Sequence, residues 1–272
     1  MRLRSELCCV LVCLMLLGCG SAPEKRNAMG AEAYRHSERG DRAYSRGDLP
    51  RAAAEYQVAL RGAQAIEDAA GIAVARINFA RVLRGSGRYE QSHQQLAALF
   101  SAPQLAYPPN SLAAAAIMQG QLYLEQEDIA AATKWAARGE QICQSGCEVR
   151  PSLQLLRAQL AMRNHRLDEA NKLVDDALGA LNSPTQAVEQ ANALRLSGEL
   201  AYAAQDDVRA ISRFEQALAL DQKLGLPLKI RLDLSRLAQT TARSGRTVEA
   251  ANYAARADAV GRASTVLTEP VP

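Results

Sequence analysis

The stretch from Leu194 to Asp221 reads LRLSGELAYAAQDDVRAISRFEQALALD and holds two blocks of apolar and small residues at helical spacing. Gly198 lies in the first block and Phe214 in the second, and the polar residues 205–207 separate the two blocks. Such a pattern predicts two amphipathic helices that pack side by side as an antiparallel hairpin. One hairpin cannot bury both of its faces, so it needs neighbours of the same kind.

The chain contains five further copies of this stretch, spaced by 40 residues except for one interval of 38. The copies align on a small residue that opens the second helix: Ala52, Ser92, Ala132, Ala170, Ala210 and Ala250. A small residue also recurs in the first helix: Gly40, Ala80, Gly120, Ala158, Gly198 and Ala238. Small residues at these places let two helix backbones approach closely.

Two more positions recur in the second helix. A side chain that is larger in most copies follows the aligned residue by four positions: Tyr56, Leu96, Ala136, Val174, Phe214 and Ala254. The residue at which the two helices are expected to cross lies seven positions after the aligned residue: Ala59, Leu99, Gly139, Ala177, Ala217 and Ala257. We expect the larger side chain to fill the space that the small residues leave between the helices.

These columns resemble the tetratricopeptide repeat (TPR), over about residues 33–262. The resemblance implies an all-α, right-handed superhelix of about six helical hairpins. The chain departs from the usual repeat because its first helices lack the tryptophan, the closing proline is absent, and the period exceeds the usual length of about 34 residues. We expect the additional residues to lengthen the second helices or the turns between repeats.

The N-terminus has the composition of a targeting segment. Arg2 and Arg4 precede an apolar run from Leu7 to Leu17, which is too short to cross a bilayer core of about 30 Å as a helix. Residues 1–18 are therefore predicted to be a cleaved signal peptide. The tetrad LLGC that ends at Cys19 resembles the bacterial lipobox, although an ordinary secretory signal with a coincidental cysteine is the alternative.

The lipobox resemblance implies that Cys19 carries a diacylglyceryl thioether and further acyl chains such as palmitate. Because Gly20, not Asp, follows the cysteine, the resemblance also implies an outer-membrane lipoprotein that faces the periplasm of a Gram-negative bacterium. Residues 19–31 are polar and carry no apolar period, so they are predicted to be a flexible tether. Residues 32–262 form the predicted superhelical domain, and residues 263–272 are predicted to be a disordered tail.

The cysteines and histidines point to no catalytic chemistry. After removal of the signal peptide and lipidation, only Cys143 and Cys147 remain, and an even pair in an oxidising compartment predicts a disulfide. The three histidines lie in different repeats and form no metal-binding motif. With no nucleophile elbow, phosphate loop or dinucleotide fingerprint, the chain is predicted to be a non-enzyme without metal or cofactor.

The first helices of stacked hairpins line the concave side of such an array. Tyr44, Arg81, Arg84, Gln121, Met162, Arg163, Arg195, Tyr202 and Arg243 are the candidate partner-binding residues. Further first-helix positions expected to face inward are Asp41, Leu124, Gln159, Glu199 and Gln239. The five arginines give this lining a basic character that would suit a peptide with acidic and apolar residues, whereas the alternative is an ordinary solvated face.

The sequence therefore predicts a lipid-anchored periplasmic scaffold that binds other envelope proteins. It is similar to TPR lipoproteins that assist secretin assembly in type IV pili, although its longer period departs from them. An adaptor for peptidoglycan enzymes or for outer-membrane protein assembly is the second hypothesis. A ligand-binding receptor or an enzyme that uses the concave groove is the third. A formal charge of +3 with no basic block excludes nucleic acid as the expected partner.

Overall fold

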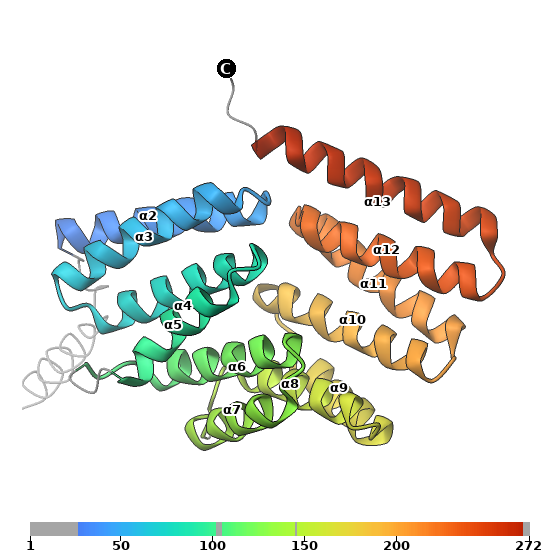
Figure 1. Cartoon of the computed structure of the whole chain (residues 1–272), viewed down its shortest axis with the longest axis horizontal. Helices are drawn as coiled ribbons and strands as arrows, with labels where there is room; N and C mark the ends of the chain where they lie inside the picture. The colour runs from blue at the N-terminus through green and yellow to red at the C-terminus, as the bar shows by residue number, and fades with distance from the viewer. Residues whose placement is uncertain (1–26, 102–104, 145, 269–272) are drawn as a thin grey trace, which may run out of the picture.

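A computed structural model describes residues 27–101, 105–144 and 146–268, and these residues form an all-α array (Figure 1). Six consecutive hairpins follow one another: α2 (Ala28–Ser45) with α3 (Leu49–Ala65), α4 (Ala69–Gly85) with α5 (Tyr89–Ser101), α6 (Pro109–Glu125) with α7 (Ile129–Ile142), α8 (Arg150–Arg163) with α9 (Leu167–Ala180), α10 (Ala187–Ala203) with α11 (Asp207–Leu224), and α12 (Pro227–Arg243) with α13 (Thr247–Thr268). A 3₁₀ turn, η1 (Pro184–Gln186), precedes α10. The predicted fold class is thereby confirmed.

Aspartates begin several of the second helices. The side chains of Asp48, Asp128 and Asp206 accept hydrogen bonds from backbone N–H groups in the first turns of α3, α7 and α11. These N–H groups have no partner inside the helix, so a capping carboxylate stabilises the helix start by about 1 kcal/mol. The residue before each cap has a positive φ, for example +81° at Gly47 and +62° at Gln205. The residues of the turn itself therefore determine the tight connection between paired helices.

Glycine in the first helix makes room for the larger side chain of the second. A Cβ added at Gly40 would lie 2.6 Å from Tyr56 Cε1, and one added at Gly198 would lie 2.6 Å from Phe214 Cε1. Both rings are 1% exposed. The aligned residue and the crossing residue are buried in all six hairpins. Of the six predicted larger side-chain positions, five are buried, and Ala254 in the last hairpin is exposed.

The helical array extends beyond the predicted domain limits. α2 begins at Ala28, inside the predicted tether, because the Asn27 side chain caps it by accepting from the Gly30 N–H and because Gly30 and Ala33 are buried. α13 continues to Thr268, inside the predicted tail. The limits of 19–31 for the tether and 263–272 for the tail are thus corrected. The signal peptide and Cys19 lie outside the described residues.

The array bends so that its first and last hairpins face each other. Figure 1 shows α2–α5 on one side, α10–α13 on the other, and α6–α9 joining them. Several apolar clusters form the interior, and each is built from neighbouring helices, as expected for stacked repeats. None of the helices described here is both long enough and apolar enough to span a lipid bilayer.

Candidate partner-binding surface

Four first helices, α4, α6, α8 and α10, surround a hollow of about 110 Å³, here named the central hollow. Its lining residues are Arg84, Gln121, Leu124, Glu125, Gln159, Met162, Arg163 and Glu199. Seven of these eight were among the positions expected to face inward. Glu125 was missed, although it lies four residues after Gln121 on the same face of α6 and the spacing could have revealed it.

Most charges of the central hollow already have partners. Arg84 donates to both carboxylate oxygens of Glu125, with its Nη2 2.6 Å from Oε1, and to the Gln121 Oε1 at 2.8 Å. Glu199 accepts from Arg236 of α12 at 3.1 Å. Within the described part of the chain, Arg163 is exposed and has no ion-pair or hydrogen-bond partner for its guanidinium. The unpaired charge of the hollow is therefore a single cation.

Two of the arginines that were predicted to bind a partner lie over aromatic rings outside the central hollow. The Arg81 guanidinium carbon is 5.8 Å from the centroid of the Tyr44 ring. The Arg243 guanidinium carbon is 3.4 Å from the centroid of the Tyr202 ring, and its Nε also donates to Asp207 at 2.8 Å. Cation–π stacking fixes these side chains. The structure thus does not gather the nine candidates into one site: Arg84, Gln121, Met162 and Arg163 share the hollow, and the two stacked pairs lie apart from it.

Arg195 is not an accessible contact, which corrects the prediction. Arg195 is only 5% exposed. Its guanidinium forms ion pairs with Asp221 of α11 and Asp233 of α12, and its Nε lies 2.5 Å from Asp233 Oδ1. Asn192 accepts from both Arg195 Nη1, at 2.9 Å, and Lys229 Nζ, at 3.2 Å. This polar cluster joins the fifth hairpin to the sixth. The two carboxylates follow Arg195 by 26 and 38 residues, so helix-face analysis of α10 alone could not reveal them.

Burial changes the acidity of this cluster. It raises the pKa of Asp221 to about 6, with the charge of Arg195 opposing the shift and that of Asp233 adding to it. Burial, together with the nearby charge of Arg195, lowers the pKa of Lys229 to about 8. Removing either member of a buried ion pair leaves an uncompensated charge. The cluster is therefore a structural junction whose strength depends on pH.

Comparison with known proteins finds similarity in structure alone. No protein-family model matches the chain, and no curated protein matches it in sequence. The apo form of RapI superposes with a TM-score of 0.64 at 12% identity, over 96% of this chain and 92% of its own. The signal transduction ATPase PH0952 from Pyrococcus horikoshii, a protein with a tetratricopeptide repeat sensor, gives a TM-score of 0.62 at 15% identity, over 89% of this chain and 36% of its own. BtubC from P. vanneervenii gives 0.55 at 17%, over 91% of this chain and 96% of its own.

The fold is that of a TPR array. At 12–17% identity these neighbours establish the fold and nothing more specific. The long period of this TPR array has two sources. The second helices α3 and α11 have 17 and 18 residues, whereas α5, α7 and α9 have only 13 or 14 residues and are followed by longer connections to the next hairpin.

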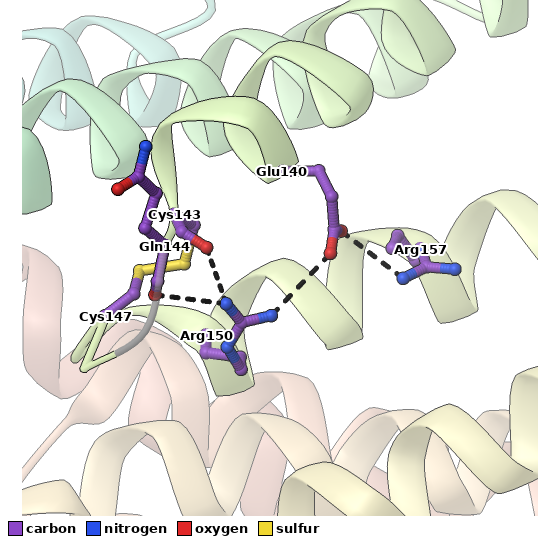
Figure 2. The surroundings of a disulfide bond; sticks show 6 residues. All are labelled: Glu140, Cys143, Gln144, Cys147, Arg150 and Arg157. Carbon is purple, nitrogen blue, oxygen red and sulfur yellow. Dashed lines mark hydrogen bonds and ion pairs between the residues drawn. A yellow bond between two sulfur atoms is a disulfide. The ribbon is translucent and has the colours of Figure 1, made fainter.

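A disulfide closes the turn between the third and fourth hairpins of the TPR array. Figure 2 shows Cys143 bonded to Cys147, with their Cα atoms 5.2 Å apart. Arg150 donates to the carbonyl oxygens of Cys143 and Gln144 at 2.5 and 3.2 Å and pairs with Glu140 at 3.6 Å. The Cys143 residue is 2% exposed within an apolar cluster of the third and fourth hairpins. The bond therefore holds the end of α7 against the start of α8.

A larger hollow, of about 400 Å³, lies beside this disulfide and is lined by Pro109, Asn110, Leu112, Ile142, Gln144, Gly146 and Cys147. None of these described lining side chains is charged or carries an imidazole. The histidines are separate: His36 contacts Glu55 at 2.7 Å, and His93 bonds to Gln119. In the described ranges, no three or more His, Cys, Asp or Glu side chains lie close enough to hold a metal.

Proposed function

We propose that this TPR array is a scaffold that binds an extended segment of a partner protein along its first helices, with one side chain of that segment in the central hollow. The observation that carries the proposal is the hollow itself, because first helices from four successive hairpins contribute to it. A surface built from several repeats fits an extended chain better than a compact small molecule. Protein binding of this general kind agrees with the TPR fold.

The polar groups of the hollow favour an acidic segment. Both lining carboxylates are paired with arginines, whereas Arg163 is unpaired within the described residues. A guanidinium can donate two parallel hydrogen bonds to one carboxylate. Leu124 and Met162 add apolar surface beside it. The partner segment therefore carries an Asp or Glu side chain next to an apolar residue.

The cellular setting rests on the sequence. The basic and apolar residues before Cys19 and the LLGC tetrad support a lipid-anchored scaffold on the periplasmic face of the outer membrane. Acyl chains at about 0.8 kcal/mol per buried methylene would hold the array there. Partners in this setting are other envelope proteins, in type IV pilus or secretin assembly, or alternatively in peptidoglycan synthesis or outer-membrane protein assembly.

Charge reversal at the hollow tests the proposal. With a photoreactive benzoylphenylalanine in place of Gln159, crosslinked partners are identified in intact cells, and the yield is then compared between Arg163→Glu and Arg166→Glu. Arg166 is an exposed neighbour that pairs with Glu169 outside the hollow, so it is the matched control. Arg163→Glu removes a hydrogen bond from a charged donor that is worth about 1.5–3 kcal/mol, so this variant should bind the partner ~10- to 100-fold more weakly. Arg166→Glu should bind the partner as tightly as the unchanged protein. Equal yields in both variants would refute the assigned site.

A further inference from the structure

One face of α6 connects the two hollows of the array. Asn110, in the first turn of α6, lines the larger hollow beside the disulfide, here named the disulfide hollow, and Gln121 lines the central hollow. These residues are 11 positions apart, which is about three turns of an α-helix, so both lie on the same face of α6. At a rise of 1.5 Å per residue, the two hollows are about 17 Å apart along this helix.

The described residues of this face between the two hollows are uncharged. On α6 they are Ala114 and Ile117. α8 contacts α6 and has Ser152 and Leu155 at the equivalent positions of its repeat. Ile117 and Leu155 are buried, and the other two are half-buried. A charged side chain lying over this surface would lose water without gaining a counter-ion, so the middle of a segment bound here should be uncharged.

Two side-chain amides border this uncharged surface and can bind a peptide backbone. Asn110 lies at one end, and Gln159 of α8 lies at the other end and lines the central hollow. In the part of the chain that the structure describes, neither amide side chain has a hydrogen-bond partner. An amide offers both a donor and an acceptor, so it can pair with the N–H and C=O groups of an extended chain. In a helix those backbone groups are already paired, and an extended segment is therefore favoured.

We propose that the disulfide hollow is a second side-chain site for the partner segment that the central hollow binds; this inference rests on the proposed function. The hollow has a volume of about 400 Å³, and its apolar lining residues are Pro109, Leu112, Ile142 and Cys147. Figure 2 shows Cys147 and Gln144, which belong to its wall, held by the disulfide and by Arg150. A preformed apolar wall suits an aliphatic side chain, which loses contact with water on entering.

The separation of the hollows sets the spacing of the side chains that they bind. A fully extended chain covers about 3.3 Å per residue, so about 17 Å requires at least about five residues, and up to about eight where the chain is less extended. Arg163, at the end of α8, binds the acidic residue at the central hollow. The segment therefore has an aliphatic residue at one end, uncharged residues in the middle and an acidic residue at the other end.

Photocrosslinking in intact cells measures this spacing. The full-length protein carries benzoylphenylalanine at Asn110, Gln159 or Ala70, and mass spectrometry locates the crosslinked residue of the captured protein. Asn110 and Gln159 should capture one segment of one protein, at residues about five to eight positions apart. Ala70 is exposed at the register position of α4 that Asn110 has in α6, and it lines neither hollow. It is the matched control and should not capture the segment.

The outcomes separate this inference from the proposed function. If Gln159 captures a segment, the second site is overturned when Asn110 captures nothing, captures another protein, or captures that segment outside the expected spacing. Equal capture from Ala70 also overturns the path along α6. In each of these cases the scaffold function stands. If Gln159 captures nothing, the scaffold function fails, and the second site fails with it.

Substitution at the disulfide hollow provides a second readout. Asn110→Trp places a large ring where the aliphatic side chain of the partner should lie, so the crosslinking yield from Gln159 should fall ~10-fold. Ala70→Trp, at the equivalent position of α4, should leave that yield unchanged. Far-UV circular dichroism of both variants shows whether each remains helical. An unchanged yield in a folded Asn110→Trp variant, or an equal fall in both variants, overturns the second site.

Discussion

Substituting Gly198 by Ala should destabilise the array, although the same change usually stabilises a helix. In a helix interior, Ala is favoured over Gly by about 0.5–1 kcal/mol. At Gly198, however, the added Cβ would lie 2.6, 2.7 and 3.0 Å from three ring carbons of Phe214. Phe214 is 1% exposed and cannot move aside freely. Overpacking of this kind costs about 1–3 kcal/mol, so we expect a net loss of ~1–2 kcal/mol in the free energy of unfolding.

Gly179 is the matched control because it lies in α9 and a Cβ there would meet no atom within 4 Å. Gly179→Ala should therefore stabilise the array by up to ~1 kcal/mol, the opposite sign. Urea denaturation followed by far-UV circular dichroism measures both free energies of unfolding. In a Phe214→Leu background the cost of Gly198→Ala should largely disappear, which gives a coupling energy of at least ~1 kcal/mol. A stabilising Gly198→Ala, or additive effects in the double variant, would refute the packing argument.

Three further predictions concern the junctions and the anchor. The pKa of Asp221 is about 6 in the folded protein and 3.8 ordinarily. The protonated carboxyl therefore stabilises the fold below pH 4, and this stabilisation is lost as the pH rises through 6. The rise in pH lowers the free energy of unfolding by up to ~3 kcal/mol. Asp221→Asn should remove that part of the pH dependence measured in urea. Thiol titration of the unfolded, unreduced mature protein should find neither Cys143 nor Cys147 free, and two thiols would disprove the bond. Cys19→Ala should move the folded protein from the membrane fraction to the soluble periplasmic fraction, and retention in membranes would contradict the anchor.

The helical packing was predictable because its determinants are local and periodic. Gly198 and Phe214 recur in register with Gly40 and Tyr56, and the structure packs each ring against its glycine. The same register located seven of the eight residues of the central hollow. Since the period of a helix decides which face a side chain occupies, one correct alignment of the repeats fixed all these positions together.

The charged junction and the contact between Leu228 and Gly47 could not be predicted in this way. Arg195 occupies an inward-facing register position, but Asp221 and Asp233 from later helices bury it. Leu228 meets Gly47 only because the curvature of five intervening junctions brings the ends of the array together. That curvature is a sum of small rotations between hairpins, and no single stretch of sequence encodes it.

We propose that partners bind to the first helices and not to the second helices. Photocrosslinking in intact cells tests it most directly, with benzoylphenylalanine placed at Gln159 on α8 or at the exposed Lys172 on α9. We predict that one envelope protein is crosslinked from Gln159, through a peptide that contains an acidic residue, and that the same protein is not crosslinked from Lys172. An equal or higher yield of that protein from Lys172 would contradict the claim.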